Sequence, residues 1–289
     1  MAPTFKIAVI QFEPKAMDIE GNFAKASSYL RQAADSGCHI AVLPEFHLTS
    51  WVPEDPGFRL ASMESSRYLD EYQKLALELK MSIVPGTICE KTGPPDEQGI
   101  GNVAHFINGE TGVVSGKYQK KNLWHPERPH LVSSGDEPHW AFDTNLRRED
   151  GRPVRAGMLI CWDLAFPEAF RALIADGAQI IIIPSWWFPN DISDSALAIN
   201  PSSEAVFIKS ATECRAFENT AAIAFANAGG LSSITMPVQG CLGRLEIGEE
   251  GMLVREIDMA VLDVAEENYK VREDMQKEGW HYNYTLTRN

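Results

Sequence analysis

Residues 180–183 are four consecutive isoleucines, and no other segment limits the possible folds of the 289-residue chain as strongly. A strand that alternates apolar and polar residues buries one face, whereas a continuous apolar run indicates a strand buried on both faces. Such strands are typical of sheets with further layers packed on both sides. The run therefore predicts a central strand in the core of a layered domain.

The remainder of the chain alternates strand-like apolar runs with amphipathic stretches, a pattern that is typical of an α/β layered domain. We expect strands at 6–11, 39–43, 82–89, 154–160, 179–183, 221–227, 253–257 and 261–264, and a hairpin of 102–107 with 113–118. We expect helices at 18–36, 69–80 and 204–218, and one that Pro167 opens. The polar stretches 91–101 and 143–153 are expected to be loops. Because no repeat or linker interrupts the pattern, residues 1–289 are predicted to form a single domain.

The charge balance narrows the classes of partner. The chain has 26 basic and 40 acidic residues, so its formal net charge is −14. No basic run is longer than two residues, which argues against a nucleic-acid partner. No apolar run approaches the ~20 residues of a membrane span, and residues 1–6 lack a signal-peptide pattern. The five cysteines form no C-x-x-C, which argues against a disulfide framework. From these features together we expect a cytoplasmic protein with no membrane partner.

Reactive side chains directly follow several of the expected strands. Ligands of open α/β sheets gather beyond the carboxyl ends of strands, so these residues are candidates for a site. Glu45 follows the strand 39–43 and Pro44, where burial would raise its pKa and make it a general base. The alternative is a solvated loop glutamate.

Lys120 and Lys121 come directly after the strand that ends at Tyr118. Because side chains alternate along a strand, one lysine can point inward while the other faces solvent. An inward lysine would supply a fixed positive charge for an oxyanion. The alternative is a pair of solvated lysines.

Cys161 ends an apolar strand, and a helix is expected to begin a few residues later. This order of strand, nucleophile and helix exposes a nucleophile at a sharp turn. The helix would also lower the pKa of the thiol and favour the thiolate. The alternative is an inert core cysteine, which is how we interpret the other cysteines.

Other chemistries have weaker support in the sequence. No G-x-S-x-G, P-loop or dinucleotide fingerprint is present. His125, His130 and His139 share one loop-rich region, but nothing places them beside a nucleophile, and their spacing fits no common metal motif. We interpret them as solvated loop residues, with a metal site as the alternative.

Glu45, Lys120 and Cys161, in this order and each at a strand end, resemble the nitrilase superfamily of carbon–nitrogen hydrolases. The likeness covers nearly the whole chain, through the ordered segments IAVIQF, VLPE, YQKKNL, ICWDLAFPE, GAQIIIIPS and RAFEN. The family lysine segment typically reads Tyr-Arg-Lys-x-His-Leu, and its register selects Lys120 over Lys121. Glutamine and asparagine replace the arginine and histidine of that pattern here.

This resemblance implies an αββα four-layer sandwich and catalysis through a cysteine thioester, with no metal and no organic cofactor. Cys161 would attack the substrate carbon, and Glu45 would take the thiol proton. Lys120 and the backbone amide of Trp162 would hold the oxyanion. Glu127 falls where many family members carry a second glutamate that positions the substrate.

The resemblance also indicates a small-molecule amide as the substrate. The segment 162–168 is similar to the amidase and carbamoyl-amidase branches, whereas nitrilases usually carry Trp-Glu directly after the cysteine. We therefore expect an amidase of small carboxamides; the alternatives are a carbamoyl amidase, a nitrilase, an acyltransferase and a non-catalytic binding protein. Tryptophans near strand ends could wall a substrate pocket, or could belong to the core or a dimer face: Trp51, Trp124, Trp186 and Trp187.

Members of this superfamily commonly form dimers, so the resemblance predicts a homodimer through the helices after the cysteine and near RAFEN. Aromatic residues also occur late in the chain, at Trp280, Tyr282 and Tyr284. These rings could pack across such an interface or against their own subunit.

Overall fold

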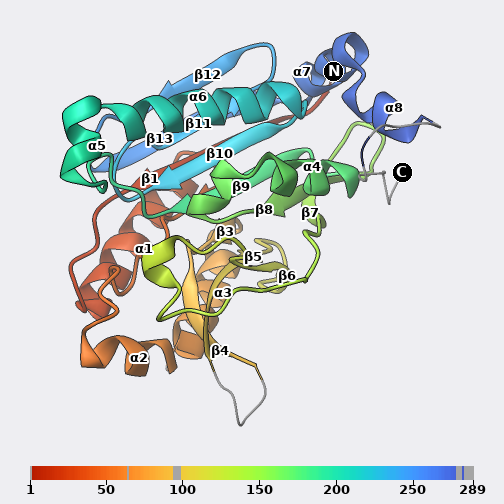
Figure 1. Ribbon diagram of the computed structural model, residues 1–289. Coiled ribbons are helices and arrows are strands. Elements are labelled where there is room, and N and C mark those ends of the chain that lie inside the picture. Colours follow the sequence, from red (N-terminus) through yellow and green to blue (C-terminus); the bar gives the residue numbers. More distant parts are fainter. Residues whose placement is uncertain (1, 64, 94–98, 278–281, 283–289) are drawn as a thin grey trace.

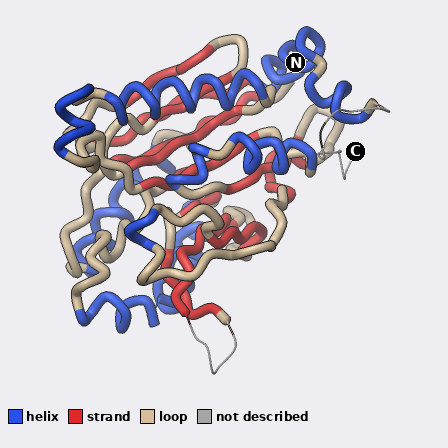
Figure 2. The backbone as a smooth tube through the Cα atoms, viewed as in Figure 1, coloured by secondary structure: helices blue, strands red, loops and turns tan. Residues whose placement is uncertain are grey.

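The computed structural model describes residues 2–63, 65–93, 99–277 and 282. Two β-sheets lie face to face, and helices cover the outer face of each sheet (Figure 1, Figure 2). The αββα sandwich that the resemblance implied is therefore confirmed. Within the described ranges, no helix is both long enough and apolar enough to cross a membrane.

The first sheet has the strand order β13 (Gly251–Asp258), β1 (Thr4–Gln11), β2 (Ile40–Val42), β3 (Ser82–Val84), β5 (Gly99–Ile107) and β4 (Ile88–Thr92), with β6 (Val114–Gln119) beside β5. Strands β1, β2 and β3 run parallel, and the other neighbours pair antiparallel. Helices α1 (Ile19–Asp35) and α3 (Ser65–Leu79) pack on its outer face. The hairpin of β5 and β6 confirms the prediction made from the polar segment between them.

The second sheet has the strand order β12 (Gly240–Arg244), β11 (Ser233–Met236), β10 (Ala222–Asn227), β9 (Ile180–Ser185), β8 (Pro153–Met158) and β7 (Phe142–Arg147). Strands β8, β9 and β10 run parallel, and the other neighbours pair antiparallel. Helices α4 (Pro167–Ala175) and α6 (Ser203–Glu218) pack on its outer face. Pro167 opens α4 as expected, because proline suits the first helical position.

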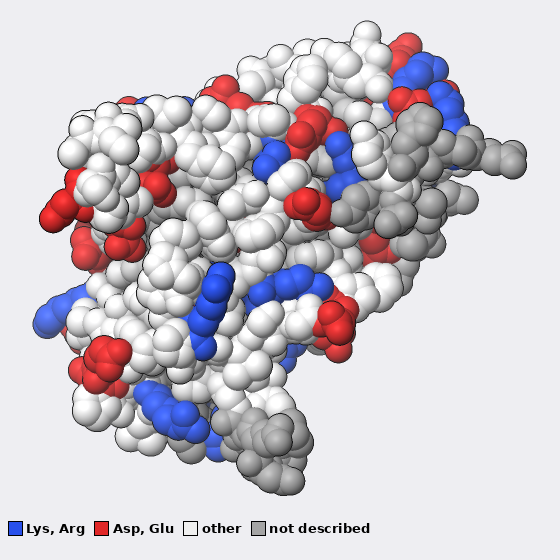
Figure 3. Space-filling view, in the orientation of Figure 1, with Lys and Arg blue, Asp and Glu red and all other residues white. Residues whose placement is uncertain are grey.

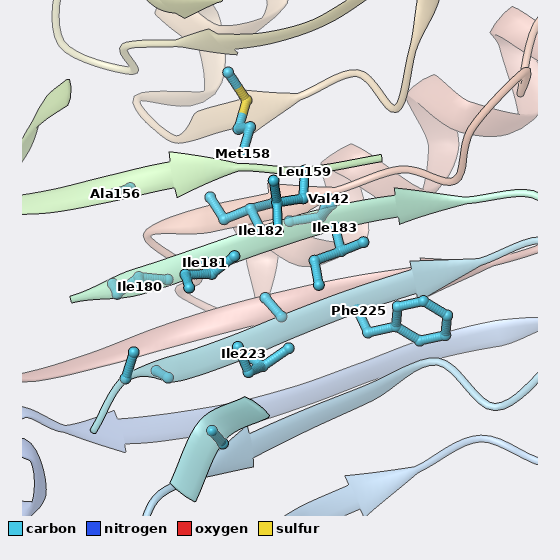
Figure 4. Packing of buried hydrophobic residues seen from close by; sticks show 14 of the residues in the cluster. Val42, Ala156, Met158, Leu159, Ile180, Ile181, Ile182, Ile183, Ile223 and Phe225 are labelled. Carbon is cyan, nitrogen blue, oxygen red and sulfur yellow. The ribbon is translucent and has the colours of Figure 1, made fainter. Parts of the chain in front are cut away.

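The isoleucine run forms β9, which lies between two parallel strands of the second sheet. Its side chains are fully buried and pack among residues of both sheets, including Ile223, Phe225 and Val42 (Figure 4). Complete burial of one isoleucine stabilises the fold by roughly 1.5–3 kcal/mol. The prediction of a strand buried on both faces is confirmed.

The expected strand 82–89 is instead two strands, β3 and β4, and Gly86 lies between them. Gly86 has a φ of +55°, a left-handed conformation that a β-carbon disfavours. A β-carbon at this position would also lie 1.9 Å from the carbonyl oxygen of Pro44. Glycine therefore allows the chain to pass directly against the segment that leads into Glu45.

The expectation of a strand at 261–264 is wrong, because these residues belong to helix α7 (Met259–Tyr269). The side chain of Asp258 caps this helix by accepting a hydrogen bond from a first-turn amide at 2.9 Å. The buried side chains of α7 fall at a spacing of three, which fits a helix and not a strand: Met259, Leu262 and Ala265.

The expected loop 143–153 is also wrong in part, because it contains most of β7. This strand pairs with β8 and buries Thr144 and Leu146, two residues apart, between polar neighbours. Strands β4 and β5 likewise extend into the expected loop 91–101. Further elements that the pattern did not indicate are β11, β12, α2 (Pro56–Met63), α5 (Asp194–Ile199) and α8 (Val271–Gln276).

The late aromatic residues bear on the predicted assembly. Trp280 and Tyr284 lie outside the described residues, and Tyr282 is exposed. The packing of these rings across a homodimer therefore stays a prediction. The single-domain organisation of residues 1–289 also stays a prediction.

Candidate active site

Glu45 is buried in the turn that follows β2. Its Oε1 accepts hydrogen bonds from the Asn102 side chain at 2.7 Å and from Lys120 Nζ at 2.9 Å. Its Oε2 accepts a hydrogen bond from the backbone amide of Trp186 at 2.7 Å. These donors come from β5, from the end of β6 and from the end of β9, so both sheets hold the carboxylate in place.

Lys120 directly follows β6 and is almost completely buried. Its Nζ donates hydrogen bonds to Oε1 of Glu45 at 2.9 Å and to Oε1 of Glu127 at 2.7 Å. Glu127 lies in a short 3₁₀ segment, where a backbone amide holds its second oxygen at 2.7 Å. The lysine that the family register selected therefore lies between two carboxylates, whereas Lys121 is half-buried.

Burial and charge act in opposite directions on the pKa values of this group. Burial raises the pKa of the Glu45 carboxyl, and the positive charge of Lys120 opposes this rise without cancelling it. For Lys120, burial alone would lower the pKa, but the surrounding negative charges, Glu45 first, leave it above its ordinary value. Lys120 is thus a permanent cation, and Glu45 takes up a proton readily, which suits a general base.

Cys161 begins a 3₁₀ turn, η3 (Cys161–Ala165), shortly after β8. Its φ of +46° lies in the left-handed region, which costs a residue with a β-carbon about 1–3 kcal/mol. Its Sγ donates to the carbonyl oxygen of Trp186 at 3.6 Å, and the amide of the same residue holds Glu45. One peptide segment therefore contacts both the thiol and the carboxylate.

Asp163 fixes the turn that carries the cysteine. It is fully buried, and its Oδ2 accepts hydrogen bonds from the Ile160 amide at 2.9 Å and from the Tyr118 hydroxyl at 2.8 Å. Its Oδ1 accepts hydrogen bonds from the amide of Asn122 at 3.0 Å and from its side chain at 2.8 Å. Asn122, which replaces the histidine of the family pattern, thus ties the lysine segment to the cysteine turn.

The expected lowering of the Cys161 pKa is wrong. Burial raises the pKa of the thiol and the charge of Glu45 raises it further, against the opposing effect of Lys120. Helix α4, which was expected to favour the thiolate, begins only at Pro167. The resting cysteine is therefore a thiol, and a reaction at its sulfur requires a base that removes the proton.

Cys161, Lys120 and Glu127 line a cavity of about 180 Å³. This volume is small compared with the roughly 300–1,000 Å³ of pockets that hold drug-sized ligands. The tryptophans that the sequence suggested as pocket walls all line it: Trp51, Trp124, Trp186 and Trp187. Trp162 lines it too, together with residues that the sequence did not indicate: Phe46, Pro126, Asp191 and Glu204.

Indole rings pack side by side along the cavity wall. Trp162 contacts Trp124 with ring centroids 4.4 Å apart, and it contacts Trp187 at 5.4 Å. Trp51 packs against Phe46 at 4.8 Å. Because each ring is held by another aromatic ring, the wall is preformed.

Sequence reasoning missed Asn102, Asp191 and Glu204. Asn102 lies in β5, where a polar residue in a hairpin strand usually faces solvent, so nothing marked it as a partner of Glu45. Asp191 and Glu204 lie after β9 and in the first turn of α6, where exposed acidic residues are ordinary. No signal along the chain connects these residues to the site.

The three loop histidines differ in environment: His125 is exposed as expected, whereas His130 and His139 are half-buried. Among the described residues, no group of three or more His, Cys, Asp and Glu side chains is arranged to hold a metal ion. His125 and His130 each pack against a tryptophan of the cavity wall. His139 stacks on Tyr118, and burial lowers its pKa to about 4, so the interpretation of His139 as solvated is wrong.

The αββα sandwich, with a cysteine, a lysine and glutamates around one cavity, places the protein in the class of carbon–nitrogen hydrolases. The sequence profile of the carbon-nitrogen hydrolase family matches residues 6–266, and the chain belongs to this family. It is a hydrolase that acts on carbon–nitrogen bonds other than peptide bonds.

Known proteins are similar to this chain over different shares of its length. A probable nitrilase from Schizosaccharomyces pombe is 25% identical over 279 residues, which cover 91% of this chain and 92% of that protein. Deaminated glutathione amidase from Bos taurus is 32% identical over 171 residues, 58% of this chain and about half (52%) of that protein. A crystal structure is available for comparison from Nit3 of Saccharomyces cerevisiae, a member of branch 10 of the nitrilase superfamily. It superposes with a TM-score of 0.76 at 21% identity and covers 96% of this chain and 97% of that chain. This last likeness supports the fold alone.

Proposed function

We propose that the protein is an amidase that hydrolyses small carboxamides to a carboxylic acid and ammonia through a thioester on Cys161. The observation that carries this proposal is Lys120, buried between two carboxylates at the cavity that the thiol lines. Burying three ionisable groups together costs desolvation energy, and clusters of this kind with shifted pKa values concentrate at functional sites.

The first half of the proposed reaction forms an acyl-enzyme. Glu45 takes the proton from Cys161, and the sulfur electron pair forms a bond to the carbonyl carbon of the amide. The carbonyl π electrons move onto the oxygen, which becomes an oxyanion. Glu45 then gives the proton to the amide nitrogen, the carbon–nitrogen bond breaks, and ammonia leaves.

Lys120 and the backbone amide of Trp162 would stabilise the oxyanion. The carboxylates that hold Lys120 keep its charge in place before the reaction, so it need not reorganise when negative charge develops. Trp162 is the second residue of η3, and amides at the start of a helical turn have no partner within the turn. Its N–H group is therefore suited to donate a hydrogen bond to the developing oxyanion.

The second half of the reaction would hydrolyse the thioester. Glu45 takes a proton from water, and the water oxygen bonds to the acyl carbon. The carbon–sulfur bond breaks, the acid leaves, and Glu45 returns the proton to the sulfur of Cys161. The sum of both halves is one amide and one water converted to one acid and one ammonia.

Glu127 is proposed to position the amide nitrogen. It lines the cavity and shares Lys120 with Glu45. A carboxylate has about four lone-pair sites, so Glu127 keeps acceptor capacity beyond the bonds it already forms. A carboxamide has two N–H groups to offer such an acceptor and a nitrile has none. This difference supports amides over nitriles, and the relatives do not choose between them, because they include both an amidase and a probable nitrilase.

Ammonia release from a panel of carboxamides, nitriles and carbamoyl compounds of matched chain length tests the proposal, with Cys161→Ala as the blank. The expected result is release from the amides alone and none with the variant. Preferred release from nitriles or carbamoyl compounds would contradict the amide assignment. Full activity of Cys161→Ala would overturn the nucleophile, and transfer of the acyl group to added amines in place of water would identify an acyltransferase.

A further inference from the structure

Two carboxylates on the cavity wall take no part in the chemistry proposed above. Asp191 and Glu204 line the same cavity as Cys161, but they form no ion pair with a described residue. Among the described wall residues, the positive charge is that of Lys120, and two other carboxylates already pair with it. The open part of the cavity therefore carries negative charge that the protein does not compensate.

Glu204 is held in a defined position. It lies in the first turn of α6, where the helix dipole stabilises a negative charge. Its Oε2 accepts a hydrogen bond from the indole nitrogen of Trp187. The side chain is half-buried, so less water screens its charge than at an open surface. Glu204 thus presents a fixed carboxylate beside an indole ring of the wall.

Asp191 extends the negative charge toward solvent. It is exposed, in the segment between β9 and α5, and its backbone amide donates to the carbonyl of Phe188 at 3.0 Å. Figure 3 shows acidic side chains gathered next to α5, at the left of the view, with few basic ones among them. A ligand that approaches from this side meets a field that attracts cations and repels anions.

The aromatic wall suits the same kind of ligand. Trp162, directly after Cys161, packs against Trp187, and Trp187 in turn donates a hydrogen bond to Glu204. A chain bound at the thiol can follow these two rings to the carboxylate. Indole faces attract ammonium groups, and their apolar surface packs against methylene groups.

We infer that the enzyme selects amides whose acyl chain ends in a positively charged amine. The amide would bind at Cys161, the methylene chain along Trp162 and Trp187, and the ammonium beside Glu204 and Asp191. This inference rests on the proposed amidase function and names its substrate class. The small cavity limits the chain to a few methylene groups, and a carboxylate at the far end would be repelled.

The test compares amides that differ mainly in the charge of their far end. The probes are γ-aminobutyramide, its neutral isostere valeramide and the anionic succinamate, with kcat/KM measured for each by ammonia release at low ionic strength. We expect γ-aminobutyramide to exceed valeramide by about 10-fold and succinamate to be the poorest substrate. Equal or lower kcat/KM for the cationic amide, while valeramide is hydrolysed, would overturn the inference and leave the proposed function intact.

Single substitutions assign the preference to the two carboxylates. Glutamine keeps an oxygen that can accept the Trp187 hydrogen bond, so Glu204→Gln removes the charge and retains the contact. Glu204→Gln and Asp191→Asn should each reduce the ratio of kcat/KM between γ-aminobutyramide and valeramide, by about 3- to 5-fold. Glu267→Gln is the matched control, because Glu267 is exposed in α7 and is not among the described wall residues. A ratio that Glu267→Gln lowers as much as Glu204→Gln does would overturn the assignment.

Binding to the inactive Cys161→Ala protein separates this inference from the proposed function. Isothermal titration calorimetry gives the Kd of γ-aminobutyramide and of valeramide without turnover. If no amide is hydrolysed by the native protein but the cationic amide binds about 10-fold more tightly, the proposed function fails and the charge selection stands. Equal affinities of the two amides would overturn the inference, whatever the activity.

Discussion

The two ends of the candidate active-site cavity hold their charges in opposite ways. At the inner end, Lys120 lines the cavity and is almost completely buried, and hydrogen bonds of 2.7–2.9 Å join it to the buried carboxylates of Glu45 and Glu127. At the outer end, Asp191 is exposed and Glu204 is half-buried, and neither pairs with a cation of the described residues. The same side-chain chemistry is therefore paired and fixed in one place, and available to a ligand in the other.

This difference shows how burial decides what a charge can do. Buried charges interact strongly and are screened little, but each must be paired, so a buried group holds one arrangement. Such an arrangement can stabilise charge that develops during a reaction, because it needs no reorganisation. Exposed carboxylates interact weakly and are screened by salt, which suits the recognition of a ligand rather than the chemical step.

Removal of the Lys120 charge should produce the largest effect. Lys120→Ala leaves the carboxylates of Glu45 and Glu127 buried without their cation, which should lower the free energy of unfolding by about 3–5 kcal/mol. It also removes the proposed oxyanion donor, so kcat should fall by about 100-fold or more. Urea unfolding and ammonia release measure the two effects.

Lys121→Ala is the matched control for this prediction. Lys121 is adjacent in sequence and half-buried, and it is not among the described wall residues. Its removal should change the free energy of unfolding by at most about 0.5 kcal/mol and the activity by at most about twofold. The reverse pattern, in which Lys121→Ala is inactive and Lys120→Ala is active, would show that the wrong lysine is assigned to the inner end.

Acid should lower the free energy of unfolding through the turn that carries Glu45, because this turn also contains the buried His47. Burial lowers the pKa of His47 to about 3 in the folded protein, below its ordinary 6.5. The unfolded chain therefore binds the proton first as the pH falls. The stability gained from neutral His47 is complete above pH 6.5 and is lost toward pH 3, by about 1.4 kcal/mol per pH unit.

Urea unfolding between about pH 7 and 5 measures this slope. His47→Gln should give a shallower dependence, because glutamine does not titrate and still reaches the Tyr72 hydroxyl, which lies 2.7 Å from His47 Nε2. His125→Gln, at an exposed histidine, should keep the native slope. Equal slopes for the native protein and His47→Gln would show that water reaches His47 in the folded protein.

Asn102→Ala should have a smaller effect on the same end of the cavity. It removes one of the donors to Oε1 of Glu45, and a hydrogen bond to a charged acceptor contributes about 1.5–3 kcal/mol. We expect kcat/KM to fall by about 10-fold, since 1.4 kcal/mol corresponds to a factor of ten. The pKa of Glu45 should rise further, so the acid limb of the pH profile of kcat/KM should move to higher pH. A lower rate with an unmoved acid limb would mean that Asn102 does not act through Glu45.

Added salt should have the smallest effect on kcat/KM, and this effect should differ between the two ends of the cavity. The distance over which exposed charges interact falls from about 10 Å at 0.1 M salt to about 3 Å at 1 M. Added NaCl should therefore lower the preference for γ-aminobutyramide over valeramide by about 2- to 3-fold, while kcat/KM for valeramide changes little. A strong salt dependence with valeramide would contradict the separation of a buried inner end from an exposed outer end.

Much of the inner end could be predicted from the sequence, because local order along the chain carries it. A buried strand followed at once by a reactive side chain marked Glu45, Lys120 and Cys161, and the structure brings Lys120 to Glu45 and lines one cavity with Lys120 and Cys161. The isoleucine run likewise marked β9, because an unbroken apolar strand has no face to offer to water.

Features that depend on contacts between distant segments could not be predicted. Asn102 reaches Glu45 across 57 residues, and no periodicity records that contact. The pKa of Cys161 was misjudged for the same reason, since the sequence shows the following helix but not the burial or the carboxylate beside the thiol. At 261–264, the side-chain cap of Asp258 and packing of one helical face prevailed over the strand propensity of valine.

Intact-protein mass spectrometry during turnover tests the central claim most directly. The protein is mixed with valeramide, quenched in acid within the first turnovers and digested to locate any adduct. The account predicts a mass gain equal to the amide minus ammonia, carried on the peptide that contains Cys161 and absent from Cys161→Ala. Turnover of valeramide by Cys161→Ala, or an acyl adduct on another residue of the native protein, would contradict it.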